Sequence, residues 1–501
     1  MNRRKFLRSS VAAGVATSLP ASSAMAQMFS SLTQVTADVR ATTGAGAEIS
    51  LSKASVKELG ESLSGPLLLP GNDGYEAARR VLNLSIDKHP AMVVQPTGAA
   101  DIKNAVAFAK DHDMLLAVKC GGHSYSGRST CDDGMQIDLS RFRNVRVDAA
   151  ARTAYVSGGS LLGEIDHETM ALGLVTTAGT VSHTGVGGLT LGAGFGRLAR
   201  RFGLALDNVK GADVVLADGS LVHASADENA DLFWGIRGGG GNFGIVTSFE
   251  FGLHPMQRQV IGGDIVFPLD RAKDVMKLYA EFSTNAPDDL YTDLIVMSMA
   301  GQESAIVMIH VCYSGPAENA ARVLEPLQKL GKPIANGIGP IDYVALQKSW
   351  DSTDPRNVGT YIKSGFINEF PQDLAARVAD GIETHPDRDT MVFFQQSGGA
   401  IGRVSPDATA FAHRKSQSNM YVTVSWPLNA DPEPHIKYVR NYWRQLEPNT
   451  DGYYANDVDD EMAQDNVNRN YRDNFDRLVT LKKRYDPTNL FRLNANIRPS
   501  T

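Results

Sequence analysis

The sequence predicts a fold that mixes α-helices and β-strands and divides into two or three domains. From Met92 onward, short strand-like apolar runs alternate with amphipathic helical runs. Farther along, residues 419–426 alternate between polar and apolar side chains with the period of two that is typical of a half-buried strand. The chain has 501 residues, of which 43% are hydrophobic, so it can bury a large core.

The first 26 residues have the features of an export signal. A pair of arginines is followed by Phe6 and Leu7, which resembles the twin-arginine signal, and a weakly apolar stretch at 11–23 precedes a small-residue cleavage pattern at 24–26. That stretch is too short and too rich in Ala, Gly and Ser to remain in a bilayer. We therefore expect residues 1–26 to be a twin-arginine signal peptide that engages the translocation machinery during export. The mature protein would be periplasmic or secreted without a membrane anchor, and an uncleaved anchor is the less favoured alternative.

Charge and cysteine content narrow the class of protein. Removal of residues 1–26 takes away four basic residues and no acidic ones, so the net charge changes from −7 to −11. Such an acidic protein does not suit nucleic acid or an anionic membrane surface. With only three cysteines the chain is not a disulfide scaffold. A bridge between Cys120 and Cys131 is one alternative, and three ordinary buried thiols are the favoured one.

The first expected elements lead up to a histidine-containing turn. Residues 27–87 are expected to form an N-terminal leader of short helices, of which 75–80 is the clearest. A strand is predicted at 92–95, and an amphipathic helix follows at 97–109 after a Thr-Gly start. The next strand is predicted at 115–119.

The elements that follow are further strands and two helices. Gly158 and Gly159 turn the chain into the first of these helices. The expected elements are strands at 135–139, 153–157 and 245–251, helices at 161–167 and 231–237, and a hairpin at 211–222.

Two glycine-spaced stretches indicate where a ligand binds. In residues 118–127, Gly121 and Gly122 precede His123 at the carboxyl end of a predicted strand, where ligands gather in folds that alternate strands and helices. Residues 179–196 contain glycine so often that side chains there would clash with a bound ligand. Together the two stretches predict a cradle for a flat cofactor.

A third glycine cluster imitates a dinucleotide-binding fingerprint. Gly239, Gly241 and Gly244 match the spacing G-x-G-x-x-G. The fingerprint requires a strand before it and a helix after it, so that the helix N-terminus faces the pyrophosphate. Here the predicted helix comes first and the strand second. We therefore reject the Rossmann interpretation.

Five motifs, in order along the chain, carry a resemblance to a known family. They are Gly-Gly-His-Ser-Tyr at 121–125, the glycine-rich run at 179–196, Leu-Asp-Asn-Val at 206–209, Asp-Leu-Phe-Trp at 231–234 with the glycines after it, and the segment at 485–494. With these motifs the chain resembles the berberine-bridge-enzyme-like FAD-linked oxidases of the vanillyl-alcohol oxidase, or PCMH-type, superfamily. The similarity extends from about residue 85 to 499.

The resemblance implies an α+β fold. It would combine a PCMH-type FAD-binding module of two subdomains with a substrate domain, an antiparallel sheet backed by helices. The FAD-binding domain would occupy residues 88–256 and the substrate domain 257–449. Residues 450–501 would form a C-terminal segment that returns to the FAD-binding domain.

In this family the histidine of the Gly-Gly-His motif is bonded to the 8α-methyl group of the flavin, so the resemblance implies FAD attached covalently to His123. Many relatives add a cysteinyl link at the position of Val181, which has no sulfur, so we expect one covalent bond, with His183 lining the ring or the ribityl chain. The other residues expected to bind the cofactor are Lys119, Cys120, Gly121, Gly122, Ser124, Tyr125, Gly127, Gly179, Thr180, Ser182, Thr184, Gly187, Gly188, Gly192, Gly194, Gly196, Asn208, Gly241, Gly244, Val246, Asn494 and Asn496.

The first candidate for the catalytic base is Tyr421, on the polar face of the strand predicted at 419–426. By resemblance it lies near the position where the name-giving enzyme has a glutamate. A phenol titrates near pH 10 when unperturbed, so it would need a partner or a positive field to act at neutral pH. A half-buried strand tyrosine without a catalytic role is the alternative.

Three other residues complete the catalytic candidates. One of Gln395 and Gln396 should face the pocket from a neighbouring strand, and Gln396 is our candidate. Tyr454 lies in a segment that resembles the family's Tyr-x-Asn-Tyr motif. Asp457 replaces the second tyrosine of that motif and offers a carboxylate base.

These expectations describe an exported FAD enzyme that oxidises a small alcohol, sugar or amine by hydride transfer to the flavin. Thr184 falls near the position where relatives control dioxygen access, and because a small polar residue does not block oxygen, dioxygen is the expected acceptor. One alternative is a dehydrogenase with another acceptor, and a second is an exported flavin-binding protein without turnover. The cysteines and histidines fit no zinc spacing, so no metal site is expected.

Overall fold

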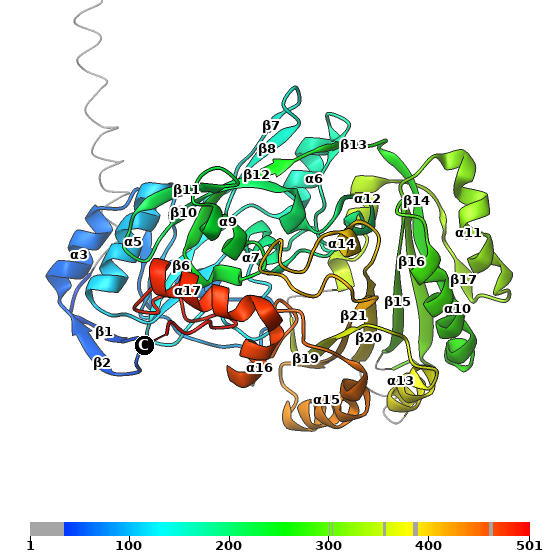
Figure 1. The fold of residues 1–501 in the computed structure, drawn as a ribbon. Coiled ribbons are helices and arrows are strands. Elements are labelled where there is room, and N and C mark those ends of the chain that lie inside the picture. The colour runs from blue at the N-terminus through cyan, green and yellow to red at the C-terminus, as the bar shows by residue number, and fades with distance from the viewer. Residues whose placement is uncertain are drawn as a thin grey trace, which may run out of the picture.

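The computed structural model shows an α+β fold in which three sheets carry most of the strands (Figure 1). It describes residues 35–299, 301–302, 304–353, 357–383, 389–459 and 464–500. The predicted signal peptide at 1–26 lies outside these residues. Within the described ranges, no helix combines the length and the apolar character that a membrane span requires.

A four-stranded sheet in the order β3-β4-β6-β5 forms the first part of the fold. Strands β4, β6 and β5 run parallel, and β3 is antiparallel to β4. Helices α3 and α5 cover it with buried apolar side chains, as the amphipathic pattern predicts. The bounds are β3 Leu67–Leu68, β4 Met92–Val94, β5 Leu116–Lys119, β6 Met135–Asp138, α3 Lys53–Glu61, α4 Tyr75–Arg79 and α5 Ala99–Asp111.

A five-stranded antiparallel sheet in the order β11-β10-β12-β8-β7 forms the second part. Its core is shared with α6, α9 and the late helix α17. The bounds are β7 Val145–Asp148, β8 Thr153–Ser157, β10 Val209–Val215, β11 Leu221–Ser225, β12 Ile245–Gly252, α6 Leu162–Met170, α7 Val186–Gly192, α8 Ala199–Phe202, α9 Ala230–Ile236, α16 Gln464–Asn470 and α17 Phe475–Tyr485. A small pair, β9 Leu174–Val175 and β13 His254–Pro255, lies apart from this sheet.

An eight-stranded antiparallel sheet forms the third part, in the order β17-β14-β16-β15-β20-β21-β19 with β18 also paired to β14. The strands are β14 Gln259–Pro268, β15 Leu290–Ser298, β16 Ile306–Tyr313, β17 Ala335–Asn336, β18 Gly339–Asp342, β19 Val358–Ile367, β20 Asp389–Gln396 and β21 Ser418–Pro427. The helices of this part are α10 Ala272–Asn285, α11 Ala320–Lys329, α12 Tyr343–Gln347, α13 Leu374–Glu383, α14 Ala400–Arg403 and α15 Glu433–Leu446.

The two faces of this sheet have different partners. Val392, Val422 and Val424 pack into the apolar core with α10, α11, α13 and α15. Phe393 and Tyr421 lie on the opposite face, because side chains alternate along a strand, and they contact a cluster that includes Val181. The large sheet therefore presents one face to the glycine-rich run at 179–196.

The C-terminal segment returns to the five-stranded part (Figure 1). Tyr485 Oη donates to Asp231 Oδ1 at 2.8 Å. The buried Lys482 Nζ donates to the carbonyl of Asn242 at 2.8 Å and to Asp486 at 2.6 Å. These bonds attach the end of the chain to the third glycine cluster.

Most expected elements are present, and one expectation is wrong. The strand that ends before His123, the hairpin at 211–222 and the order of helix before strand around Gly239–Gly244 are confirmed. The segment before Pro90 is not a leader of short helices alone, because it contains β1 Val39–Thr42, β2 Glu48–Leu51 and β3. Leu67 and Leu68 are buried, and their pairing with β4 makes this segment part of a sheet. The domain boundaries stay a prediction.

Candidate active site

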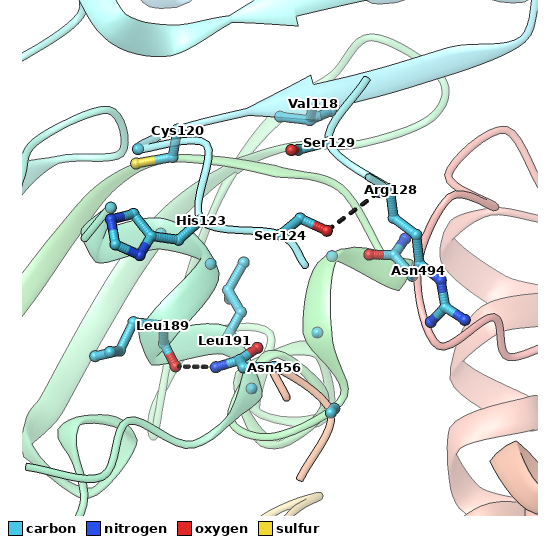
Figure 2. Close-up of a pocket in the computed structure, with 18 of the residues that line it drawn as sticks. Val118, Cys120, His123, Ser124, Arg128, Ser129, Leu189, Leu191, Asn456 and Asn494 are labelled. Carbon is cyan, nitrogen blue, oxygen red and sulfur yellow. Dashed lines mark hydrogen bonds between the residues drawn. The ribbon is translucent and has the colours of Figure 1, made fainter. Parts of the chain in front are cut away.

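A cavity of roughly 340 Å³ lies between the four-stranded and five-stranded sheets and reaches the eight-stranded sheet. The loop after β5 lines one side of it with His123, Ser124 and Arg128, and Leu191 and Asn456 line the other (Figure 2). Two glycine-rich stretches and the carboxyl end of the chain thus meet at one site. The first two were expected to form a cradle.

Many of the residues expected to bind a cofactor line this cavity. They come from the ends of strands and from α7, where the backbone is close to the open space. The lining candidates are Cys120, Gly121, Gly122, His123, Ser124, Tyr125, Gly179, Thr180, Thr184, Gly187, Gly188, Gly192, Gly241, Gly244, Val246 and Asn494.

Other candidates lie outside the lining and make structural contacts. Lys119 points away because side chains alternate along β5, so Val118 and Cys120 face the cavity and Lys119 binds the carbonyl of Ala78. Asn208 donates to Leu204 O at 2.8 Å and accepts from His254. The remaining candidates outside the lining are Gly127, Ser182, His183, Gly194, Gly196 and Asn496.

His123 is the cavity residue with the most specific surroundings. Its Nε2 lies 2.8 Å from Nδ1 of His183, and its Nδ1 lies 3.4 Å from Oγ1 of Thr184. His183 does not line the cavity, contrary to expectation, but stands behind His123. Asp351, from a distant part of the chain, accepts hydrogen bonds from the backbone N–H and hydroxyl of Ser182.

Two glycines of this region differ in what surrounds them. A Cβ on Gly121 would lie 2.3 Å from the backbone nitrogen of Gly185, so these two stretches are glycine because they cross each other. A Cβ on Gly188 would meet no protein atom within 4 Å, although this residue is in α7 and lines the cavity. Glycine destabilises a helix by about 1 kcal/mol relative to alanine, so a glycine inside α7 needs another reason. The open space beside Gly188 gives one, because a bound group could occupy the place that a Cβ would take.

The large sheet contributes the other end of the site. Tyr421 lines the cavity from β21 and stacks on Phe393, with ring centroids 4.8 Å apart. Gln395 and Asp457 also line it. Asn419 Nδ2 donates to Asp457 Oδ2 at 2.9 Å and to Gln395 Oε1 at 3.3 Å, which links β20, β21 and the segment after α15.

Asp457 is the acid–base candidate that its surroundings favour. Burial raises the pKa of its carboxyl to about 7, although the hydrogen bond from Asn419 acts in the opposite direction. A carboxyl that titrates near neutral pH can exchange a proton with a substrate under ordinary conditions. Removal from water thus gives this carboxyl the property that a general base needs.

Gln396 does not face the cavity, and that expectation is corrected. Its Oε1 accepts from the backbone N–H of Thr292 at 2.7 Å, and its Nε2 donates to Ser283 O at 2.8 Å. Because β20 alternates, Gln395 faces the cavity and Gln396 faces the helices.

Tyr454 lines the cavity but is not poised as a base. Its hydroxyl oxygen accepts from the backbone N–H of Gly194 at 3.0 Å and from Asn456 Nδ2 at 2.8 Å. Burial raises the pKa of the hydroxyl well above its usual value, so it stays protonated at neutral pH. In this position Tyr454 attaches the segment at 453–457 to the glycine run.

Asn419 and Arg128 were not expected at the site, and Asn456 was expected only as a member of the Tyr-x-Asn-Tyr segment, without a role there. Asn419 shares the face of Tyr421 by strand alternation, so that pattern could have identified it. Asn456 donates to Leu189 O at 3.2 Å. Arg128 brings a positive charge to the cavity wall four residues after Ser124, whose hydroxyl accepts its backbone N–H at 3.1 Å.

Cys120, Cys131 and Cys312 are free thiols, and burial raises the pKa of the Cys120 thiol to about 11. Cys120 Sγ lies 3.0 Å from Gly158 O. In the part of the chain that the structure describes, no cluster of three His, Cys, Asp or Glu side chains could bind a metal ion.

Comparison with known proteins identifies the family. A model described as an FAD binding domain matches residues 90–225, and one described as berberine and berberine like matches residues 453–498. An FAD-linked oxidoreductase of Dictyostelium discoideum is 32% identical, over 89% of this chain and 97% of that protein. (R)-6-hydroxynicotine oxidase of Paenarthrobacter nicotinovorans is 27% identical, over 87% of this chain and 97% of that protein. Xylooligosaccharide oxidase of Thermothelomyces thermophilus is 29% identical, over 94% of this chain and 99% of that protein.

Solved structures agree on the fold. That of 6-hydroxy-D-nicotine oxidase from Arthrobacter nicotinovorans matches with a TM-score of 0.81 at 24% identity, over 88% of this chain and 99% of that chain. Xylooligosaccharide oxidase from Myceliophthora thermophila C1 matches with a TM-score of 0.79 at 27% identity, over 89% of this chain and 99% of that chain. These matches confirm the expected PCMH-type α+β fold. The chain belongs to the berberine-bridge-enzyme-like family of FAD-linked oxidoreductases and is itself an FAD-dependent oxidoreductase.

Proposed function

We propose that this oxidoreductase carries FAD on His123 through one covalent bond and oxidises a small organic alcohol, sugar or amine, with dioxygen as the electron acceptor. The observation that carries the proposal is one cavity with His123 at its wall and the Asp457 carboxyl in the same lining. Oligosaccharide and hydroxynicotine oxidases among the relatives support the substrate range.

The residues of the chain divide the work. When bound, FAD accepts a hydride from a carbon that carries oxygen or nitrogen. Asp457 takes the proton from the hydroxyl or amine of the substrate, since its pKa is raised to about 7. Gln395 and Tyr421, in the same lining, orient the substrate by hydrogen bonding.

A single tether is favoured by the residues around the cavity. Val181, at the position where many relatives have a second link, lines the cavity without a sulfur atom. The thiol of Cys120 is also a poor nucleophile, because burial keeps it protonated. His123, in the Gly-Gly-His motif at the cavity wall, is the side chain that we expect to hold the flavin.

We also propose that the chain is exported by the twin-arginine route to the periplasm or beyond. The support is the paired arginines, the weakly apolar stretch and the cleavage pattern in residues 1–26. A fusion of these residues to a reporter should be exported only in cells with an active twin-arginine pathway. Export through the general secretory pathway would contradict the proposal.

Anaerobic reduction tests the chemistry. A panel of alcohols, sugars and amines is mixed with the holoenzyme without oxygen, and loss of the visible absorbance of the oxidised flavin identifies a substrate. Admission of air should then restore the absorbance within the turnover time and produce one peroxide per flavin. Slow reoxidation without peroxide would show a dehydrogenase, and a flavin that no compound bleaches would show a binding protein.

A further inference from the structure

Two imidazole rings are in direct contact at the wall of the cavity. Nε2 of His123 lies 2.8 Å from Nδ1 of His183, and the ring centroids are 4.8 Å apart. A hydrogen bond between two ring nitrogens needs one N–H donor and one lone pair. The protonated nitrogen of one ring therefore determines the protonated nitrogen of the other.

Asp351 determines the direction of this hydrogen bond. Its backbone carbonyl oxygen lies 3.3 Å from Nε2 of His183, and a carbonyl oxygen can only accept. Nε2 of a neutral His183 therefore carries the hydrogen, and Nδ1 of His183 is the acceptor. Asp351 is itself fixed by Ser182, whose N–H and hydroxyl donate to the carboxylate at 2.8 and 2.6 Å.

The hydrogen bond to His183 determines the tautomer of His123. Since Nδ1 of His183 accepts, Nε2 of His123 must donate, and the lone pair of the neutral ring is at Nδ1. His123 lines the cavity and His183 does not. The second histidine thus holds the first in one tautomer and one orientation.

We propose that His183, held by Asp351, is a positioning residue for flavin attachment and that Nδ1 of His123 forms the bond. This inference rests on the proposed covalent link. The bond forms between Nδ1 and the 8α carbon as a C–H bond of that carbon breaks, and the proton from carbon passes to solvent. Nδ1 of His183 takes the proton from Nε2 of His123 and releases it to solvent. The two electrons of the broken C–H bond remain on the flavin until dioxygen takes them up, together with two protons, as hydrogen peroxide.

The nitrogen can be identified in the wild-type holoprotein. A proteolytic flavin peptide is isolated, and nuclear Overhauser contacts of the 8α methylene protons are recorded. Attachment at Nδ1 places these protons near the Cβ protons of His123, whereas attachment at Nε2 places them near the Cδ2 proton. Contacts to the Cδ2 proton would overturn the inference, and this experiment needs no variant that must fold.

Variants test the role of His183. For His183→Ala we expect the covalent fraction of the bound flavin, measured after acid precipitation of protein from matched cultures, to fall at least tenfold. His183→Asn, which keeps an acceptor oxygen near the position of Nδ1, should restore part of it. His167→Ala, an exposed residue of α6, is the matched control and should load as wild type.

The outcomes separate this inference from the proposed function. A wild type without covalent flavin contradicts the proposed function itself. If the wild type has covalent flavin and His183→Ala has the same covalent fraction, only the role of His183 is contradicted. Retention of non-covalent flavin by His183→Ala, with an unchanged unfolding temperature, shows that its loss of attachment is not a loss of fold.

Discussion

At the scale of single residues, Asp457 is the residue on which the proposed proton transfer depends. Its carboxyl lines the cavity, accepts from Asn419 at 2.9 Å, and has a pKa raised to about 7 by burial. Tyr454, in contrast, keeps its proton and accepts two hydrogen bonds. The carboxylate is therefore the better base at neutral pH.

Asp457→Asn tests this assignment. Only the ionised carboxylate is a base, so wild-type kcat/KM should rise with pH up to about 7 and then level off. In the variant we expect kcat/KM to fall by about 10²–10⁴ and the dependence near pH 7 to disappear, with the flavin content unchanged. A variant that keeps the wild-type pH profile would exclude Asp457 as the base.

A second buried carboxyl gives a prediction for stability. Burial raises the pKa of Asp293 to about 7, so the folded state binds its proton more tightly than the unfolded state does. Stability from this residue is therefore lost as the pH rises from about 4 to about 7. At pH 8, Asp293→Asn should raise the free energy of unfolding by on the order of 1–4 kcal/mol, and the gain should shrink toward pH 4. Equal gains at both pH values in urea titrations would contradict this.

At the scale of elements, strand alternation decides which side chains reach the site. The sequence could predict β5, β20 and β21, but it left open which of Gln395 and Gln396 faces the cavity. The register of β20 with its neighbouring strands determines which of the two side chains faces the cavity, and the sequence of one strand does not reveal that register. The same ambiguity explains the wrong expectation for Lys119. This residue belongs to β5, which leads to the site, but its side chain points to the opposite face of the strand.

Helix α7 offers a test of the cradle. Gly188→Ala adds one methyl group where no protein atom lies within 4 Å of the added carbon. We expect the variant to bind at least tenfold less FAD while the apoprotein unfolds at the same or a slightly higher temperature, because alanine favours a helix by about 1 kcal/mol. Gly339→Ala in β18, which is equally open, is the matched control. Normal flavin content in Gly188→Ala would show that the flavin does not use this space.

At the scale of the whole molecule, the large sheet and the glycine run are joined by a buried cation. Arg197 Nε donates to Nε2 of His310 at 2.8 Å, and Nη1 donates to Thr180 O at 2.9 Å and to Gln347 Oε1 at 3.0 Å. Its side chain also lies over the Trp350 ring. One residue thus fixes part of the cavity wall against the large sheet.

Replacement of this cation should weaken fold and flavin binding together. Arg197→Gln leaves buried acceptors without their charged donor, so we expect the free energy of unfolding to fall by at least about 2 kcal/mol. The flavin content of the purified protein should fall as well, because the cavity wall at Thr180 loses its anchor before FAD is incorporated. The control is Arg146→Gln, an exposed arginine of β7 that lies over the Tyr155 ring and far from Thr180 in sequence; it should leave the flavin content unchanged and lower the free energy of unfolding by at most about 1 kcal/mol. A destabilised variant with the flavin content of the wild type would show that the anchor does not shape the cavity.

Contacts between distant segments explain the rest of what the sequence did not reveal. The family resemblance predicted the fold, and glycine spacing, which is a local signal, indicated two segments that line the cavity, His123 among them. Asp351 escaped, since nothing near it in sequence indicates that it meets Ser182. Strand alternation places Asn419 on the face of Tyr421, but it does not show that Asn419 meets Asp457. The strand at Leu67–Leu68 escaped because a two-residue element has no measurable period.

Acid precipitation of the purified protein, followed by peptide mass spectrometry, tests the central claim most directly. We predict that the flavin stays with the precipitate and that one FAD adduct is found on the peptide that carries His123, whereas His123→Ala releases all of its flavin. A colourless protein, or a wild type whose flavin passes entirely into the supernatant, would contradict the account.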